Sequence, residues 1–127
     1  VQSNMPATLD AAALCKMVDP RQITGAIVDG PLALDNAIDI EAARTKQIRS
    51  PVAGRANVLL VPDLEAGNML GKSLSFLAGA GAAGIVLGAR VPIILTSRAD
   101  SLLTRLASCA VAVLVAQARR EGERVLG

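Results

Sequence analysis

The chain has 127 residues, which suits one domain, and 52% of them are hydrophobic, so it can bury a core and is not disordered. It contains no His, Trp or Tyr and one Phe, which excludes imidazole metal sites and His-based triads and argues against stacking on single-stranded nucleic acid. A net charge of +2 with interspersed signs gives no basic stripe for DNA or RNA.

The two cysteines, Cys15 and Cys109, are far apart and have no metal-ligand spacing. They suit a reducing cytoplasm, and no secretory signal is visible, so we expect a cytoplasmic protein without a metal. The most apolar window, residues 106–118, is too short to span a bilayer unaided, so we expect no membrane partner. The chain opens on Val1 rather than Met, which is typical of a processed product or of a piece of a longer chain.

The first half of the chain predicts helices around two short strands. Thr8 is a candidate cap for a helix over 9–18, which Asp-Pro then stops. An apolar run at 23–28 predicts a buried strand, and 35–48 predicts one or two short helices. Residues 57–61 form the most strand-like run in the sequence.

The second half continues this alternation. We predict a helix over 64–78, strands at 85–87 and 92–95 around a turn, and a last helix over 101–120 that is apolar nearly all round. Helices alternating with short apolar strands predict an α/β fold: a three-layer α/β/α arrangement with a mostly parallel sheet. The last helix is expected to be buried on more than one side.

Residues 79–84 match the G-x-G-x-x-G dinucleotide fingerprint, but a predicted helix precedes them and a strand follows, which is the reverse of the required order. We therefore predict a tight helix-to-strand turn there. Asp29 and Asp35 lie close in sequence without a metal-ligand pattern, and a turn plus a helix cap accounts for both.

A polar turn, residues 96–101, separates the last predicted strand from the last helix. Such turns bind ligands in α/β folds, and a helix N-terminus favours anions. Ser97 offers a hydroxyl, Arg98 a planar guanidinium suited to phosphate, and Asp100 an acid. The alternative is structural: Ser97-x-x-Asp100 resembles a capping box, Asp100 could be the helix N-cap, and Arg98 could be a solvated charge.

A second candidate group follows the 57–61 run. Asp63 is a candidate helix cap, and Asn68 could donate to a substrate oxygen. Lys72 lies one turn further on the same side of the helix, where it could bind substrate or simply face solvent.

Four segments together resemble the phosphate acetyl/butyryltransferase family, in the right order and over nearly the whole chain. They are Asp29–Ala37, Val52–Gly54, Val61–Asn68 and Leu95–Ser101. The Thr-Ser-Arg-Ala-Asp-Ser form is similar to the butyryltransferase-like branch, which includes acetyltransferase domains fused behind an enoyl-CoA hydratase domain.

The resemblance implies the C-terminal part of a fold with two α/β domains and a cleft between them. Residues 1–82 would finish the second domain, and residues 83–127 would return to complete the first. The chain is then expected to be a fragment of a homo-oligomeric, dimeric enzyme, and less than half of the catalytic unit.

The resemblance also implies the chemistry: acyl-CoA and phosphate interconvert with acyl phosphate and CoA by direct thiol attack in a ternary complex. No cofactor, metal or covalent enzyme intermediate is implied, since CoA and phosphate are substrates. The family's serine-arginine pair falls on Ser97 and Arg98. Arg98 would neutralise phosphate oxygens, and Ser97 would hydrogen-bond the substrate or the thiol.

Two departures from the family pattern bear on activity. The acetyltransferase branch has a proposed base, an aspartate, seven residues after the serine, where this chain has Thr104, so Asp100 is the nearest available carboxylate. The missing N-terminal part would carry further phosphate- and CoA-binding groups. Alternatives are a non-catalytic acyl-CoA-sensing domain like that at the C-terminus of some malic enzymes, and an incomplete fold used only in dimer assembly.

Overall fold

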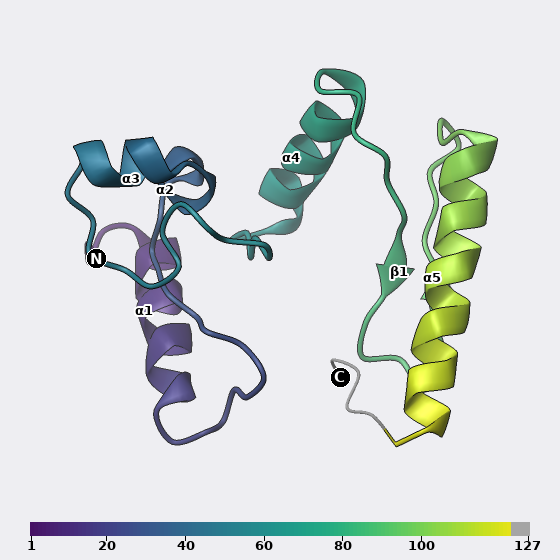
Figure 1. The fold of residues 1–127 in the computed structure, drawn as a ribbon, viewed down its shortest axis with the longest axis horizontal. Coiled ribbons are helices and arrows are strands. Elements are labelled where there is room, and N and C mark those ends of the chain that lie inside the picture. Colours follow the sequence, from purple (N-terminus) through teal and green to yellow (C-terminus); the bar gives the residue numbers. More distant parts are fainter. Residues whose placement is uncertain (123–127) are drawn as a thin grey trace. The chain divides into compact units, whose positions relative to one another are not determined.

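The computed structural model describes residues 1–122, and the chain forms two compact units, one over 1–66 and one from 67 onward. The elements in chain order are α1 (Pro6–Val18), α2 (Leu34–Ile38), α3 (Ile40–Thr45), α4 (Leu64–Phe76), β1 (Ile85–Val86), β2 (Ile93–Ile94) and α5 (Leu102–Arg120) (Figure 1). The predicted division between residues 82 and 83 concerns the domains of a complete two-domain fold and stays a prediction.

Helix α1 begins earlier than predicted. It starts at Pro6, which favours the first helical turn because its fixed φ suits a helix and its missing N–H is not needed there. The N-cap is Met5, so the predicted Thr8 cap is wrong. The Thr8 hydroxyl instead lies within hydrogen-bond distance of the Gln2 and Met5 carbonyls, at 3.0 and 2.8 Å, and tethers the N-terminal segment to the helix.

The core of the first unit lies where α2, α3 and the following loop meet. Asp39 caps α3 by accepting hydrogen bonds from two backbone N–H groups at 2.7 and 2.9 Å. Gly54 has a φ of +75°, and a Cβ there would lie 2.5 Å from the Ile40 Cα, so only glycine fits. The buried residues of this small core are Asn36, Ala37, Ala43 and Ala53.

The strands predicted at 23–28 and 57–61 are absent, so these two predictions are wrong for this chain. A strand exists only when a neighbour pairs with its N–H and C=O groups, and no other described segment pairs with either run. The apolar side chains of the second run are left uncovered: Val58 is 79% and Leu60 76% exposed.

Helix α4 and the glycine-rich segment behind it follow the sequence pattern. Asp63 Oδ1 accepts a hydrogen bond from the Ala66 N–H at 2.7 Å, which confirms Asp63 as the cap. The segment 79–84 runs from a helix into a strand, as predicted. Gly84 passes so close to β2 that a Cβ there would lie 2.3 Å from the Leu95 carbonyl oxygen.

The sheet differs from the prediction. Strands β1 and β2 pair antiparallel, with Ile85 opposite Ile94 and Val86 opposite Ile93. Within residues 1–122, this pair makes up the sheet. The connection, residues 87–92, is far too short for a parallel crossover, which needs a dozen or more residues. The expectation of a mostly parallel three-layer sheet is therefore not confirmed here.

Helix α5 packs along both strands. Its covered side presents small residues, Ser108 and Ala112, which let the strands approach. Near its C-terminal end, Arg119 Nη1 donates to the Ala89 carbonyl at 2.8 Å and so ties the helix to the hairpin turn. Gly122 follows the last turn with a φ of +76°, a conformation that favours glycine just after a helix end.

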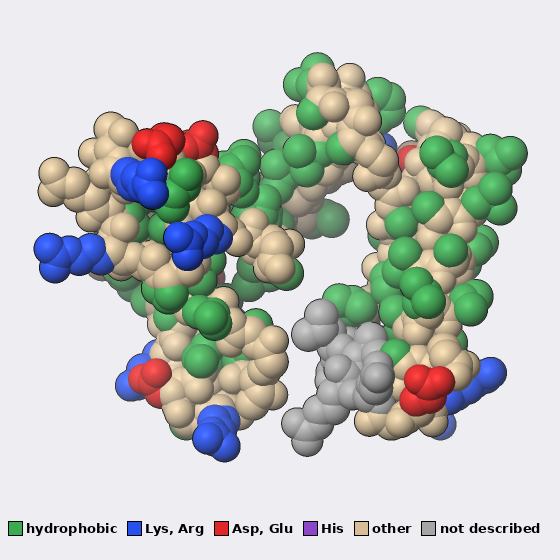
Figure 2. Space-filling model, in the orientation of Figure 1, with side chains coloured by type: hydrophobic (Ala, Val, Ile, Leu, Met, Phe, Trp, Pro, Cys, Tyr) green, Lys and Arg blue, Asp and Glu red, His purple; other side chains and the backbone are tan. Residues whose placement is uncertain are grey.

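The prediction that α5 is buried on more than one side is wrong for this chain. The large apolar side chains of its outer face are 58–74% exposed, and Figure 2 shows hydrophobic atoms along the helix. They are Leu102, Leu103, Leu106, Val113 and Leu114. By length and composition alone, α5 is also able to cross a membrane, a test that core helices of soluble proteins pass as well.

Candidate functional site

A tight turn between β2 and α5 contains three of the predicted site residues, and we call Ser97–Asp100 the Ser97 turn. The Ser97 carbonyl accepts from the Asp100 N–H at 3.1 Å, and Asp100 Oδ2 accepts from the Ser97 N–H at 2.6 Å. The Ala99 N–H donates to Ser97 Oγ at 3.3 Å. The structure therefore brings Ser97, Arg98 and Asp100 together in one backbone-supported loop.

Asp100 does not cap α5. The N-cap is Ser101, whose Oγ accepts from the Thr104 N–H at 3.1 Å. The Asp100 carboxylate is turned back onto Ser97, so it cannot also reach the helix N–H groups, and the N-cap alternative for Asp100 is wrong. The capping-box resemblance reflected a real bond between Asp100 and Ser97, but one that lies in the turn before the helix.

Removal of this cap has a predictable cost. We expect Ser101→Ala to lower the free energy of unfolding by about 1 kcal/mol, because the Thr104 N–H loses its acceptor, while Ser101→Asp retains the cap. Urea denaturation of the three forms measures the difference. An unchanged midpoint for Ser101→Ala would contradict the assignment of Ser101 as the cap.

A second arginine approaches the Ser97 turn. Arg98 is exposed, and its carbonyl accepts a hydrogen bond from Arg105 Nη2 at 3.3 Å. Sequence reasoning missed Arg105, although it stands four residues after the N-cap Ser101 and therefore on the same side of the helix. The Ser97 turn thus carries one arginine, Arg98, and is contacted by a second, Arg105, and two arginines suit a ligand with several negative charges.

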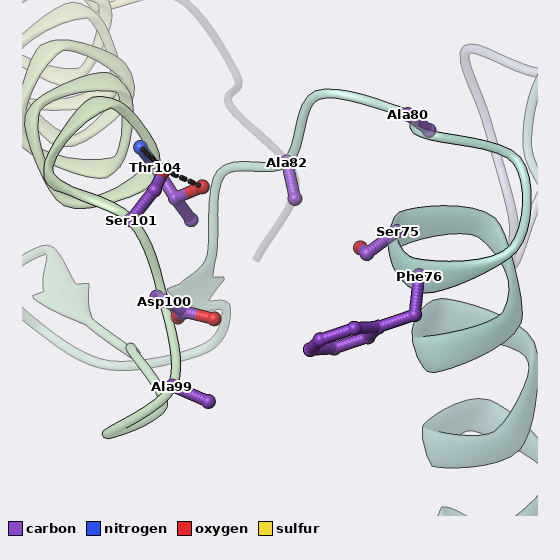
Figure 3. Close-up of a pocket in the computed structure, with 8 residues that line it drawn as sticks. All are labelled: Ser75, Phe76, Ala80, Ala82, Ala99, Asp100, Ser101 and Thr104. Carbon is purple, nitrogen blue, oxygen red and sulfur yellow. Dashed lines mark hydrogen bonds between the residues drawn. The ribbon is translucent and has the colours of Figure 1, made fainter.

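A pocket of about 200 Å³ lies in the second unit, beside the Ser97 turn. Figure 3 shows the Asp100 side chain, from the Ser97 turn, and the Phe76 ring, from the end of α4, extending into the space between these two segments. Thr104 also lines the pocket, with its hydroxyl 3.1 Å from Ser101 Oγ. The lining residues are Ser75, Phe76, Ala80, Ala82, Ala99, Asp100, Ser101 and Thr104.

The other predicted pair, Asn68 and Lys72, lies on the exposed side of α4 and does not line this pocket. Lys72 Nζ sits 5.4 Å from the centre of the Phe76 ring, at the distance of a cation–π contact. Lys72 is therefore linked to the pocket wall through Phe76. Asn68 makes no such link among residues 1–122.

Two carboxylates of the first unit, Asp29 and Asp35, have structural partners, and the predicted helix cap at Asp35 is wrong because the N-cap of α2 is Ala33. Asp29 Oδ1 accepts from the Gly30 N–H at 2.8 Å, in a turn. Asp35 pairs with Lys46 at 2.6 Å, and the hydrogen bond from Lys46 lowers the pKa of the Asp35 carboxyl. No cluster of three or more metal-ligating side chains occurs within residues 1–122.

The chain is similar to known acyltransferases over most of its length. A family model described as phosphate acetyl/butaryl transferase matches residues 1–113. A phosphate acetyltransferase from Rhizobium meliloti is 67% identical over 123 residues, 97% of this chain and 39% of that protein. A phosphate butyryltransferase from Clostridium beijerinckii is 48% identical over 116 residues, 91% of this chain and 38% of that protein.

A solved structure is similar as well. The crystal structure of a branched-chain phosphotransacylase from Enterococcus faecalis V583 superposes with a TM-score of 0.76 at 35% identity, covering 88% of this chain and 40% of that one. This chain therefore spans 38–40% of the length of these three proteins. Over the matched part, it has the α/β fold of that structure.

Proposed function

Because the chain belongs to the phosphate acetyl/butaryl transferase family, we propose that it is part of an enzyme that transfers an acyl group between coenzyme A and inorganic phosphate. The observation that carries the proposal is the Ser97 turn, where the family's serine-arginine pair precedes a helix N-terminus. We call the complete polypeptide that would contain this chain the parent, since the chain alone spans 33–40% of the length of its relatives.

The reaction needs charge stabilisation and alignment more than covalent catalysis. In the proposed direction of acyl-CoA synthesis, the CoA sulfur attacks the carbonyl of an acyl phosphate, a C–S bond forms, and the C–O bond to phosphate breaks. The thiol proton passes to a base, for which Asp100 is the nearest carboxylate in the turn. Negative charge grows on the carbonyl oxygen and on the leaving phosphate, so donors preorganised at both positions would accelerate the step.

The turn supplies suitable donors. Arg98 is exposed and would bind phosphate oxygens, and Arg105 adds a second guanidinium from the first turn of α5. The Ser97 hydroxyl accepts a bond from Ala99 and donates none within residues 1–122, so its proton is available to a substrate oxygen. The N–H groups of Leu102 and Leu103 open α5, where the helix dipole also favours an anion.

We also propose further substrate-binding residues, a localisation and an oligomeric state. Asn68 and Lys72, one turn apart on exposed α4, would bind polar groups of CoA or phosphate, without a metal or cofactor. The parent is expected to be a cytoplasmic homo-oligomer with no nucleic-acid or membrane partner. The exposed apolar face of α5 supports burial against other protein, since a bare face of this kind is unfavourable in water.

Arg98 provides the first test of the function. We expect Arg98→Lys in the parent to lower kcat/KM for acyl transfer by roughly 10²-fold or more, because lysine keeps the charge but loses the planar fork that fits phosphate. The assay is phosphate-dependent release of CoA from acetyl-CoA and from butyryl-CoA.

Arg44→Lys is the matched control, because Arg44 makes an exposed ion pair with Glu41 in the first unit. It should leave the rate unchanged. Near-normal kinetics of Arg98→Lys would remove Arg98 from the site. A parent that binds acetyl-CoA but does not turn it over would instead favour the acyl-CoA-sensing alternative.

A further inference from the structure

Ser108 is fully buried in the side of α5 that faces the strands, with 0% of its surface exposed. Its hydroxyl donates to the Thr104 carbonyl at 2.7 Å and accepts from the Gly84 N–H at 3.0 Å. The second bond joins residues that are 24 positions apart. A buried hydroxyl that both donates and accepts a hydrogen bond holds its two partners in place, because the loss of either bond inside a protein is costly.

The chain of bonds continues from Gly84 to the site. The Gly84 carbonyl accepts from the Leu95 N–H at 3.0 Å, and the two backbones lie so close that no side chain fits at position 84. Leu95 stands two residues before Ser97. The Ser97 turn is therefore attached to α5 at both ends: through the Ser101 cap on one side, and through Leu95, Gly84 and Ser108 on the other.

We propose that Ser108 is a positioning residue for acyl transfer, which holds the entry to the Ser97 turn in register with the N-terminus of α5. The proposal rests on the proposed function of that turn. Ser108 does not touch the substrate. It acts through Gly84 and Leu95 on the direction in which Ser97 and Arg98 leave the strand.

The loss of the hydroxyl has a specific consequence. In Ser108→Ala the Thr104 carbonyl keeps its helical bond, but the Gly84 N–H loses its acceptor, so the attachment of Leu95 to the helix weakens. A displacement of about 1 Å in a catalytic group can reduce a rate on the order of 10²-fold. We therefore expect kcat of the parent to fall by roughly 10-fold or more, with a smaller change in KM.

The control for general destabilisation is Ala112→Gly, one turn further along the covered side of the same helix. Glycine weakens the helix without touching the bonds to Gly84. Both variants are assayed at a temperature where circular dichroism shows them folded. If Ala112→Gly loses as much kcat as Ser108→Ala, the effect is general and the proposal is overturned.

A double-mutant cycle with Arg98→Lys tests whether Ser108 acts through the turn. The fold-loss in kcat of the double variant should be smaller than the product of the two single fold-losses, because a misplaced turn has already lost much of what Arg98 provides. Independent effects would give the full product. If Ser108→Ala does not fold, Ser108→Cys replaces it in every arm, since a thiol is a weaker acceptor of similar size. Fully multiplicative losses would overturn the proposal.

Amide hydrogen exchange separates this proposal from the proposed function, because it requires no activity. In Ser108→Ala, the amides of Leu95 and Ser97 should exchange at least several-fold faster than in the unchanged parent, and in Ala112→Gly they should not. Unchanged exchange overturns the positioning role. A parent without acyltransferase activity overturns the proposed function, and the exchange data still decide whether Ser108 fixes the turn.

Discussion

We expect the 127-residue chain alone to release no CoA from acetyl-CoA or butyryl-CoA in the presence of phosphate, while the parent does. The reason is geometric. CoA and an acyl phosphate must be aligned so that sulfur meets carbonyl carbon, and alignment of this kind can account for roughly 7–11 kcal/mol of a barrier. The chain spans only 33–40% of the length of its relatives, so under the proposed function most of the groups that align the two substrates would lie outside it.

The dimensions of the site agree with this expectation. The pocket beside the Ser97 turn has about 200 Å³, below the usual range of a few hundred Å³ or more for pockets that enclose ligands of drug size, and CoA is larger still. Under the proposed function, Arg98 and Arg105 would hold a single phosphate at the start of α5, and the nucleotide end of CoA would need further groups.

The assay uses the purified chain and the parent at equal concentration, with circular dichroism confirming that the chain is helical. The parent carrying Arg98→Lys serves as the low-activity reference. Turnover by the chain at more than a small fraction of the parent rate would show that the complete site lies within these residues, and that the expected two-domain cleft is not needed.

The second large effect is expected for Asp100→Asn in the parent. If Asp100 takes the thiol proton, the rate should fall on the order of 10²–10⁴-fold, the range for loss of a general base. Asparagine retains a side-chain oxygen that can accept from the Ser97 N–H, so the turn should persist and the loss should report the carboxylate charge alone.

The matched control is Asp63→Asn, which makes the same chemical change at the cap of α4. Asparagine also caps well, so neither activity nor stability should change. kcat/KM is measured across a pH series for both variants, because loss of a base removes the acidic limb of the profile. An active Asp100→Asn enzyme with an unaltered profile would leave Asp100 with a structural role only, as the acceptor for the Ser97 N–H.

The helices could be predicted from the sequence because their signals are local. Asp63, for example, stands directly before α4 and lies within one turn of the Ala66 N–H that it caps. The strand predictions at 23–28 and 57–61 failed because an apolar run becomes a strand only when another segment pairs with it, and that partner is not a property of the run.

The candidate site shows the same division. The sequence predicts that Ser97, Arg98 and Asp100 share one site, and the family resemblance implies the roles of the first two. The sequence could not predict that Ser101 rather than Asp100 is the N-cap of α5. Both residue types cap helices well, and the choice depends on how the turn closes. Ser108 was missed because its partner, the Gly84 N–H, is 24 residues away in sequence. The partner of Arg105, the Arg98 carbonyl, is only seven residues away, but their contact depends on how the turn between them closes.

The uncovered outer face of α5 has a consequence for the life of the chain in a cell. Leu102, Leu106 and Leu114 present the kind of surface that chaperones bind and that promotes aggregation. A truncated gene that yielded this chain by itself would therefore reduce the amount of protein as well as its activity, because quality-control proteases remove such species. Immunoblots of a truncation strain would show a faint band where messenger RNA levels predict a strong one.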